Sequence, residues 1–366
     1  GGGGGGGGGG DSSGAIVPVA PARFLDTRGA DGNYAAQGRL AAGGIVKVPI
    51  AGVGDVPGNA VGVVVNVTAV TPDGPGHATL YPCTANPPEA SHLNYGPGEV
   101  VANNTVVPLA ADGSLCIYTH AGADYIVDVN GYVPPASPVD LFTPTRFLDT
   151  RDTGPVGAQS HVAVKIAGSN GVPADARAAI VSVTAVLPTG PGFVSLYPCT
   201  GDPMSASTLN YSAGQVIPNG AIVELSAAGE VCIFTYAASH LLLDVAGYVP
   251  ATDSLHTLAP ERLCDSREPA DRLDAGDFRE VQVTGRFGIP AGATAAILNV
   301  AAITPDGPGH LTVWPCGDRP NTSNLNYTAG IVRANNTLTK LSSSGSVCVF
   351  THAGADLIVD VSGYLE

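Results

Sequence analysis

Short apolar runs separated by turns make up most of the chain. In the first third these runs, rich in β-branched and aromatic residues, cover 16–19, 23–27, 45–50, 61–70, 78–82, 92–95, 100–109, 115–119 and 125–133. Turn-forming Gly, Pro and Asp separate them, most clearly at 72–76, 97–98 and 112–113. No stretch places apolar residues at helical spacing. The pattern predicts eight or nine short β-strands in this third, and residues 61–70, with almost no polar face, should form a central strand covered on both sides.

The same pattern occurs three times. Three sets of residues recur at steps of 116 or 117: Cys83, Cys199 and Cys316; Asn94, Asn210 and Asn326; and Asp128, Asp244 and Asp360. A repeat of this length contains a whole domain, unlike the short units of solenoids. We therefore expect an all-β protein of three tandem β-sandwich or jelly-roll-like domains at 15–133, 134–249 and 250–366, after a flexible glycine-rich tail at 1–14. The short junctions fit either a rigid row or a threefold cluster.

The recurring motifs resemble those of a known family. They include RFLDTR, NVTAVTPDGPGHATLYPC, LNYGPGEVVANNTVVPL and DYIVDVNGY in the first repeat, with close counterparts in the other two. The set is similar to tandem repeat domains of secreted actinobacterial proteins, and the resemblance covers essentially the whole chain beyond residue 14. It implies extracellular modules, often in tandem or attached to secreted hydrolases, and no agreed biochemical activity.

Composition narrows the classes of partner. The 366 residues are 44% hydrophobic and only 13% charged, which is typical of a globular protein. The net charge of −15 disfavours nucleic acid, because no basic surface is available to bind phosphates. No apolar stretch reaches the roughly 18 residues that a membrane-spanning helix needs.

Six cysteines are spaced as one pair per repeat. Their separations of 33, 33 and 32 residues predict three disulfides and an extracytoplasmic location, whereas zinc sites use closer doublets. The seventh, Cys264, replaces a leucine and should be a buried apolar residue. The predicted disulfides are Cys83–Cys116, Cys199–Cys232 and Cys316–Cys348.

Recurring charged residues predict structural ion pairs. Each late aspartate should be partly covered by its sheet and so needs a cationic partner. We expect Arg28–Asp128, Arg151–Asp244 and Arg267–Asp360. Calcium is disfavoured, because the chain lacks the spacing of converging carboxylates that it requires.

Two histidines per repeat are candidates for contact across neighbouring strands. If the cysteines of a repeat oppose each other, His77 and His120 are diagonal neighbours, as are His310 and His352. The middle repeat exchanges both together, for Phe193 and Tyr236, which supports their proximity. A metal or pH-sensitive site is one interpretation. An aromatic-like surface pair is the other, and we favour it.

Amide and aromatic residues beside each other suit a glycan site. The candidates are Asn94, Tyr95, Asn210, Tyr211, Asn326 and Tyr327, with the pairs Asn103–Asn104 and Asn335–Asn336 in support.

No catalytic motif is found, and triplication is unusual for an active site. We therefore expect a non-enzymatic secreted surface, scaffold or appendage protein without a cofactor, whose partners are its own copies or other cell-surface components. A carbohydrate- or cell-wall-binding module is the alternative.

Overall fold

The fold is all-β, as predicted. The computed structural model describes residues 15–29, 38–83, 86–88, 90–200, 207–251, 254–268 and 270–366, so the predicted tail at 1–14 lies outside the described residues. Within these ranges the chain forms strands β1 to β24 and no helix. Each repeat contributes eight strands. The predicted runs at 16–19 and 23–27 join into one strand, β1, which bends at two register shifts.

The strands keep the same order in each repeat. The first repeat contains β1 (Val17–Asp26), β2 (Ile45–Pro49), β3 (Gly62–Val70), β4 (Gly76–Pro82), β5 (Leu93–Tyr95), β6 (Val100–Pro108), β7 (Ser114–Thr119) and β8 (Asp124–Val133). The second contains β9 (Asp140–Asp149), β10 (Ser160–Lys165), β11 (Ala178–Val186), β12 (Gly192–Pro198), β13 (Leu209–Tyr211), β14 (Val216–Glu224), β15 (Glu230–Thr235) and β16 (His240–Val249). The third contains β17 (Leu255–Asp265), β18 (Phe278–Gln282), β19 (Ala295–Ile303), β20 (Gly309–Trp314), β21 (Leu325–Tyr327), β22 (Arg333–Lys340), β23 (Ser346–Thr351) and β24 (Asp356–Leu365).

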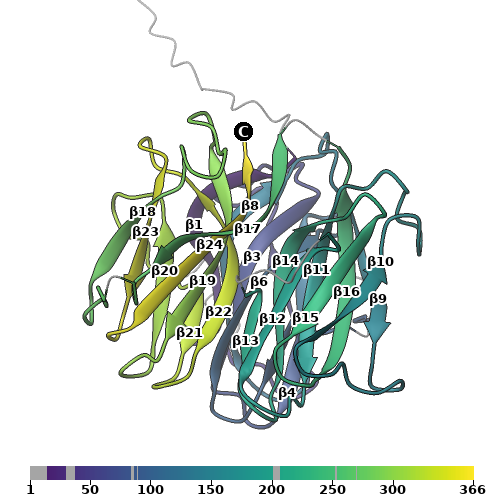
Figure 1. The fold of residues 1–366 in the computed structure, drawn as a ribbon, viewed down its shortest axis with the longest axis horizontal. Coiled ribbons are helices and arrows are strands. Elements are labelled where there is room, and N and C mark those ends of the chain that lie inside the picture. Colours follow the sequence, from purple (N-terminus) through teal and green to yellow (C-terminus); the bar gives the residue numbers. More distant parts are fainter. Residues whose placement is uncertain are drawn as a thin grey trace, which may run out of the picture.

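Each repeat forms two antiparallel four-stranded sheets. An inner sheet has the order β1-β8-β3-β6, and an outer sheet the order β2-β7-β4-β5. The same two orders recur as β9-β16-β11-β14 with β10-β15-β12-β13, and as β17-β24-β19-β22 with β18-β23-β20-β21. All strand pairings stay within one repeat. Figure 1 shows the repeats as neighbouring groups of strands, coloured from purple through teal to yellow.

The prediction of three tandem β-sandwich or jelly-roll-like domains is wrong. The six sheets form a six-bladed β-propeller of small sheets, two blades per repeat. The sequence period therefore spans two blades. The strand count was nearly right, but the alternation of apolar residues does not show how sheets are grouped in space.

The apolar residues form one core in each repeat and a further core shared by all three. In β3, Val63, Val65 and Val67 belong to the core of the first repeat. Val64, on the opposite face, belongs to the shared core, where it joins Ile180 of β11 and Ile297 of β19. Every residue of β3 is buried, which confirms that this strand is covered on both faces. Because the shared core draws on all three repeats, the arrangement is a threefold cluster and not a row.

Three asparagines link the repeats into a closed ring. We call Asn103, Asn219 and Asn335 the asparagine ring; each is about 1% exposed. Gly220 N donates to Asn103 Oδ1 at 3.0 Å, Asn336 N donates to Asn219 Oδ1 at 3.5 Å, and Asn104 N donates to Asn335 Oδ1 at 3.1 Å. Each bond joins two repeats, so the three bonds close around a common axis formed by β6, β14 and β22.

Each residue of the asparagine ring also makes a hydrogen bond within its own repeat. The side-chain amides donate to the backbone carbonyls of His92, Thr208 and Asn324, respectively. A residue type that occurs three times thus performs one structural task three times. Asn103 and Asn335 were glycan candidates, and their burial and bonding show that their amides are already used.

Candidate functional site

A pocket of about 550 Å³ lies where the three repeats meet, at one end of the axis. Its walls include the first residues of β6, β14 and β22 and the short strands β5 and β21. In β22, Arg333 pairs near Ala302, whereas Leu365 at the end of β24 pairs with Ala295 at the other end of β19. The pocket and the C-terminus therefore lie at opposite ends of the molecule. Figure 1 marks the C-terminus at the top of the view and labels β21, one of the strands that line the pocket, lower down.

The pocket contains a buried arginine that breaks the threefold repeat. Arg333 is 9% exposed and occupies the position of Val101 and Ile217 in the other repeats. Its Nη1 donates to Gln215 Oε1 at 3.3 Å. Within the part of the chain that the structure describes, it makes no other side-chain hydrogen bond and no ion pair. Burial lowers the pKa of Arg333, and the negative charge of Glu99 opposes that shift.

Two other polar side chains of the pocket accept hydrogen bonds from the backbone of the turn in which they lie. Glu99 Oε2 accepts a hydrogen bond from Gly96 N at 2.8 Å, and Gln215 Oε1 accepts one from Ser212 N at 2.7 Å. These two side chains occupy equivalent positions in the first and second repeats, so their orientation is set by the fold. The pocket thus combines a fixed carboxylate, a fixed amide and a guanidinium.

The predicted aromatic glycan platform is wrong. Tyr95, Tyr211 and Tyr327 are only 5%, 3% and 4% exposed. The hydroxyl of each lies 2.8 Å from a threonine hydroxyl two strands away in the same sheet, namely that of Thr119 on β7, Thr235 on β15 and Thr351 on β23, respectively. Their rings belong to the cores of the three repeats, so they do not form an exposed platform, although Tyr95 also lines part of the pocket wall.

The adjacent asparagines are half-buried, and two of them meet in the pocket. Asn94 and Asn326 both line it, although they come from the first and third repeats. The Oδ1 atoms of Asn94, Asn210 and Asn326 accept hydrogen bonds from Ser91, Ser207 and Ser323, respectively. Because the oxygen of each amide is engaged in this way, the NH₂ groups of Asn94 and Asn326 are the donors that these two side chains can offer to a ligand.

The paired histidines are direct cross-strand partners. Their ring centroids lie 5.3 Å apart in both pairs, stacked at 27°. Phe193 and Tyr236 stack in the same way, at 5.5 Å, which confirms the proximity inferred from their joint exchange. The predicted diagonal register is wrong by two residues, because Cys116 pairs with Tyr81 and not with Cys83. Cys83 lies just past the end of β4.

In the middle repeat an aromatic pair occupies the same place, and in the first repeat His77 and His120 also line the axial pocket. Burial and the neighbouring His120 lower the pKa of His77, and burial and His352 lower that of His310 to about 4. Both histidines are therefore uncharged at neutral pH. Among the described residues, no three His, Cys, Asp or Glu side chains gather in a way that would hold a metal ion.

The buried aspartates are paired, but with a different arginine from the one predicted. Arg23 Nε and Nη2 donate to the two carboxylate oxygens of Asp128 at 2.9 and 3.2 Å. The equivalent pairs are Arg146–Asp244 and Arg262–Asp360. The predicted partners Arg28, Arg151 and Arg267 bind Asp26, Asp149 and Asp265 instead.

Strand geometry explains the error. Arg23 lies directly opposite Asp128 in the pairing of β1 with β8, whereas Arg28 lies past the end of β1. Burial raises the pKa of Asp128, and the paired Arg23 opposes that shift. Burial alone would also raise the pKa of Asp26, but its bonds from Arg28 outweigh this effect and lower it.

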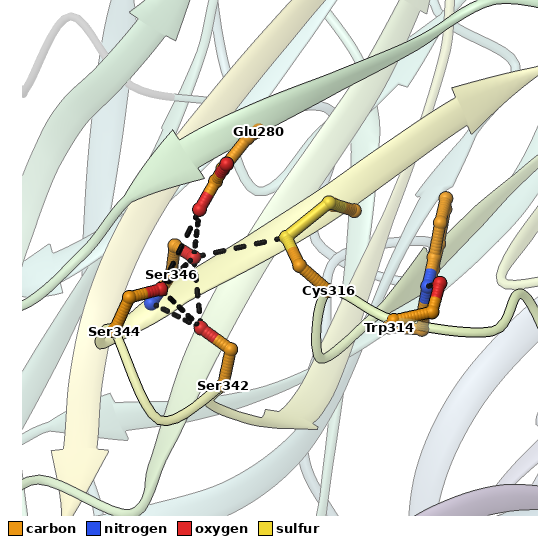
Figure 2. Close-up of a disulfide and its surroundings, with 8 residues drawn as sticks. Glu280, Trp314, Cys316, Ser342, Ser344 and Ser346 are labelled. Atoms are coloured by element: carbon orange, nitrogen blue, oxygen red, sulfur yellow. Dashed lines mark hydrogen bonds between the residues drawn. A yellow bond between two sulfur atoms is a disulfide. The ribbon is translucent and has the colours of Figure 1, made fainter.

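The three predicted disulfides are confirmed. They join Cys83 to Cys116, Cys199 to Cys232 and Cys316 to Cys348. Figure 2 shows the third one beside a cluster of hydroxyls, in which Ser346 bonds Glu280 and approaches Cys316. Cys264 is the free cysteine of the described residues; it is partly buried and packs against the core of the third repeat.

Sequence reasoning missed Arg333, Glu99 and Gln215. The predictions rested on residues that recur, and the residues at these positions differ between repeats. The usable signal was the reverse one: a charged residue at a position where the other two repeats carry Val101 and Ile217.

Comparison with known proteins gives little further information. No protein-family model matches the chain, and no curated protein does. One similar solved structure is described as "The Triple Jelly Roll Fold and Turret Assembly in an Archaeal Virus". It has 10% sequence identity, covers 88% of this chain and 84% of the other, and has a TM-score of 0.20. A likeness at that TM-score carries no argument about this chain.

Proposed function

We propose that this chain is a non-enzymatic, secreted structural protein that serves as a rigid surface, scaffold or appendage component. The asparagine ring is the observation that carries the proposal. Three recurrent residues are used to tie the repeats to one another rather than to form three separate sites. Together with the shared core, the ring holds the repeats as one body.

Two features support an extracellular role, the disulfides and the resemblance of the motifs. The three disulfides fit a protein from an oxidising compartment. The motifs resemble those of secreted actinobacterial repeat domains. No helix in the described residues is long and apolar enough to cross a membrane.

The outer sheets offer edges for assembly. Strands β2 and β18 lie at the edges of their sheets, where unpaired backbone groups can bind another strand. Ile45 on β2 is 51% exposed and Phe278, its equivalent on β18, is 61% exposed. Large exposed apolar side chains on edge strands are typical of interaction surfaces. The partners we propose are other copies of the chain or other cell-surface components.

Native mass measurement and electron microscopy of the concentrated protein test this proposal. We expect ordered assemblies that are lost in the double variant Ile45→Lys, Phe278→Lys, because charges on an edge strand prevent pairing. Leu187→Lys is the matched control, since Leu187 is 60% exposed but lies outside the strands. Dispersed monomers at high concentration, together with no retention on the cell surface, would contradict the proposal.

Carbohydrate binding is the second candidate. It is favoured by one observation, the meeting of Asn94 and Asn326 in the axial pocket. A glycan array distinguishes the two functions. Binding that is lost in Asn94→Ala and Asn326→Ala, but kept in Asn210→Ala, would support the carbohydrate-binding function.

A further inference from the structure

The buried guanidinium of Arg333 makes no direct ion pair with any of the described residues. A buried guanidinium is costly unless it is paired with an anion and its donors are satisfied. Arg333 has five N–H donors, and its one side-chain bond goes to the neutral amide of Gln215. No carboxylate oxygen of the described residues lies within 4.0 Å of the Arg333 guanidinium, the distance that defines an ion pair. Glu99 lines the same pocket and its charge acts on Arg333 from beyond the distance of an ion pair, while its Oε2 accepts the hydrogen bond from Gly96 N.

The fold does not require an arginine here. At the equivalent positions, Val101 and Ile217 pack at the same end of the axis in the other two repeats. A buried charge at a position where the architecture accepts an aliphatic side chain destabilises the free protein. Such a residue is explained if its partner comes from outside the chain.

We propose that the axial pocket binds a small, hydroxylated carboxylic acid, such as an acidic monosaccharide, whose carboxylate pairs with Arg333. This goes beyond the structural role proposed above and does not depend on it. The planar guanidinium binds a planar carboxylate through two parallel hydrogen bonds. The volume of about 550 Å³ falls within the usual range for small-ligand sites.

The other polar groups of the pocket define the rest of the ligand. The side-chain amides of Asn94 and Asn326 suit hydroxyl groups. Glu99 adds a negative charge, which disfavours a doubly charged anion such as phosphate. A single carboxylate on a hydroxylated carbon frame satisfies the guanidinium and the amides at once.

Isothermal titration of the full chain tests the site with three probes: glucuronate, glucose and inorganic phosphate. We expect glucuronate to bind at least about tenfold more tightly than either of the others, because only it combines a carboxylate with hydroxyl groups. Arg333→Val, which restores the side chain of the first repeat, should abolish glucuronate binding. Arg319→Val removes an exposed arginine outside the pocket and should leave the affinity unchanged.

Thermal unfolding with and without glucuronate gives a second readout. Glucuronate should raise the Tm of the wild type and leave that of Arg333→Val unchanged. If Arg333→Val fails to fold, Arg333→Gln provides the same comparison. No binding of glucuronate, equal binding of phosphate, or binding that survives both substitutions would overturn the proposal. Assembly of Arg333→Val is measured separately, so failure of the structural role would be distinguishable.

Discussion

A buried histidine should make the first repeat sensitive to acid. His92 is 3% exposed, and its Nδ1 accepts a hydrogen bond from Leu80 N at 3.0 Å. In the other repeats the same backbone bond is accepted by Thr208 Oγ1 and Asn324 Oδ1, at 3.0 and 2.8 Å. These two residues do not titrate. Protonation of His92 would replace the acceptor on Nδ1 with a donor that faces Leu80 N–H.

The size of the effect follows from the two states of the imidazole. Burial lowers the pKa of His92 from 6.5 to about 4 in the folded protein. The unfolded chain therefore takes up a proton below pH 6.5, which the folded protein does not take up until about pH 4. Stability falls as the pH drops through this window and is restored as it rises. At 1.36 kcal/mol per pKa unit, the free energy of unfolding at pH 4 is about 3 kcal/mol lower than at neutral pH because of His92.

The test is urea unfolding of the wild type and of His92→Asn between pH 7.5 and 4. The substitution copies the third repeat, where Asn324 Nδ2 also donates to Thr337 Oγ1; the first repeat has Thr105 at that position. Other acid-sensitive groups are common to both proteins and cancel in the difference. The free energy of unfolding of the variant should rise by about 3 kcal/mol relative to that of the wild type as the pH falls to 4. Parallel curves for the wild type and His92→Asn would refute the reasoning.

Three further predictions concern stability. Gly220→Ala should destabilise the protein by about 1–3 kcal/mol in urea unfolding, because an added Cβ would lie 2.2 Å from the backbone oxygen of Asn104, while Gly58→Ala, with nothing within 4 Å, should be close to neutral. The double variant Cys83→Ala, Cys116→Ala should have a free energy of unfolding about 3–4 kcal/mol lower than the wild type, because the unfolded chain is no longer closed into a loop by the disulfide. A reductant should destabilise the wild type but should not further destabilise the first repeat of the variant. Without ligand, Arg333→Val should be more stable than the wild type by about 1–3 kcal/mol in the same assay; a loss of stability would mean that the arginine is satisfied within the chain.

Recurrence in the sequence was a good guide to local structure. The cysteine spacing predicted all three disulfides, and the joint exchange of the histidines for Phe193 and Tyr236 predicted their contact. Both inferences rest on pairs within one repeat. Finer geometry was not accessible in this way. The partner of Asp128 depends on which residue of β1 lies opposite it, and the bends in β1 shift that register.

The grouping of the sheets was harder to predict. The apolar character of residues 61–70 correctly indicated two covered faces, but it did not show that Val64 faces the other two repeats while Val63 and Val65 face their own core. The tyrosines of the three LNY motifs failed as glycan candidates for a related reason. A tyrosine between a strand and a turn has the same sequence signal whether its ring is exposed or lies in a core, and here its hydroxyl finds a buried threonine.

Positions where the repeats differ carry the information that recurrence conceals. Gly220 stands where the first and third repeats have Asn104 and Asn336. A Cβ added at Gly220 would lie 2.2 Å from the backbone oxygen of Asn104, so there is no room for a side chain there. The axis is therefore only approximately threefold, because the second repeat has a glycine where the backbone of the first repeat comes close. Arg333 departs from the pattern in the opposite sense, since it adds a buried charge that makes no direct ion pair with the described residues. The first difference is explained by packing within the chain; the second is not, and this contrast is why we assign Arg333 to a ligand.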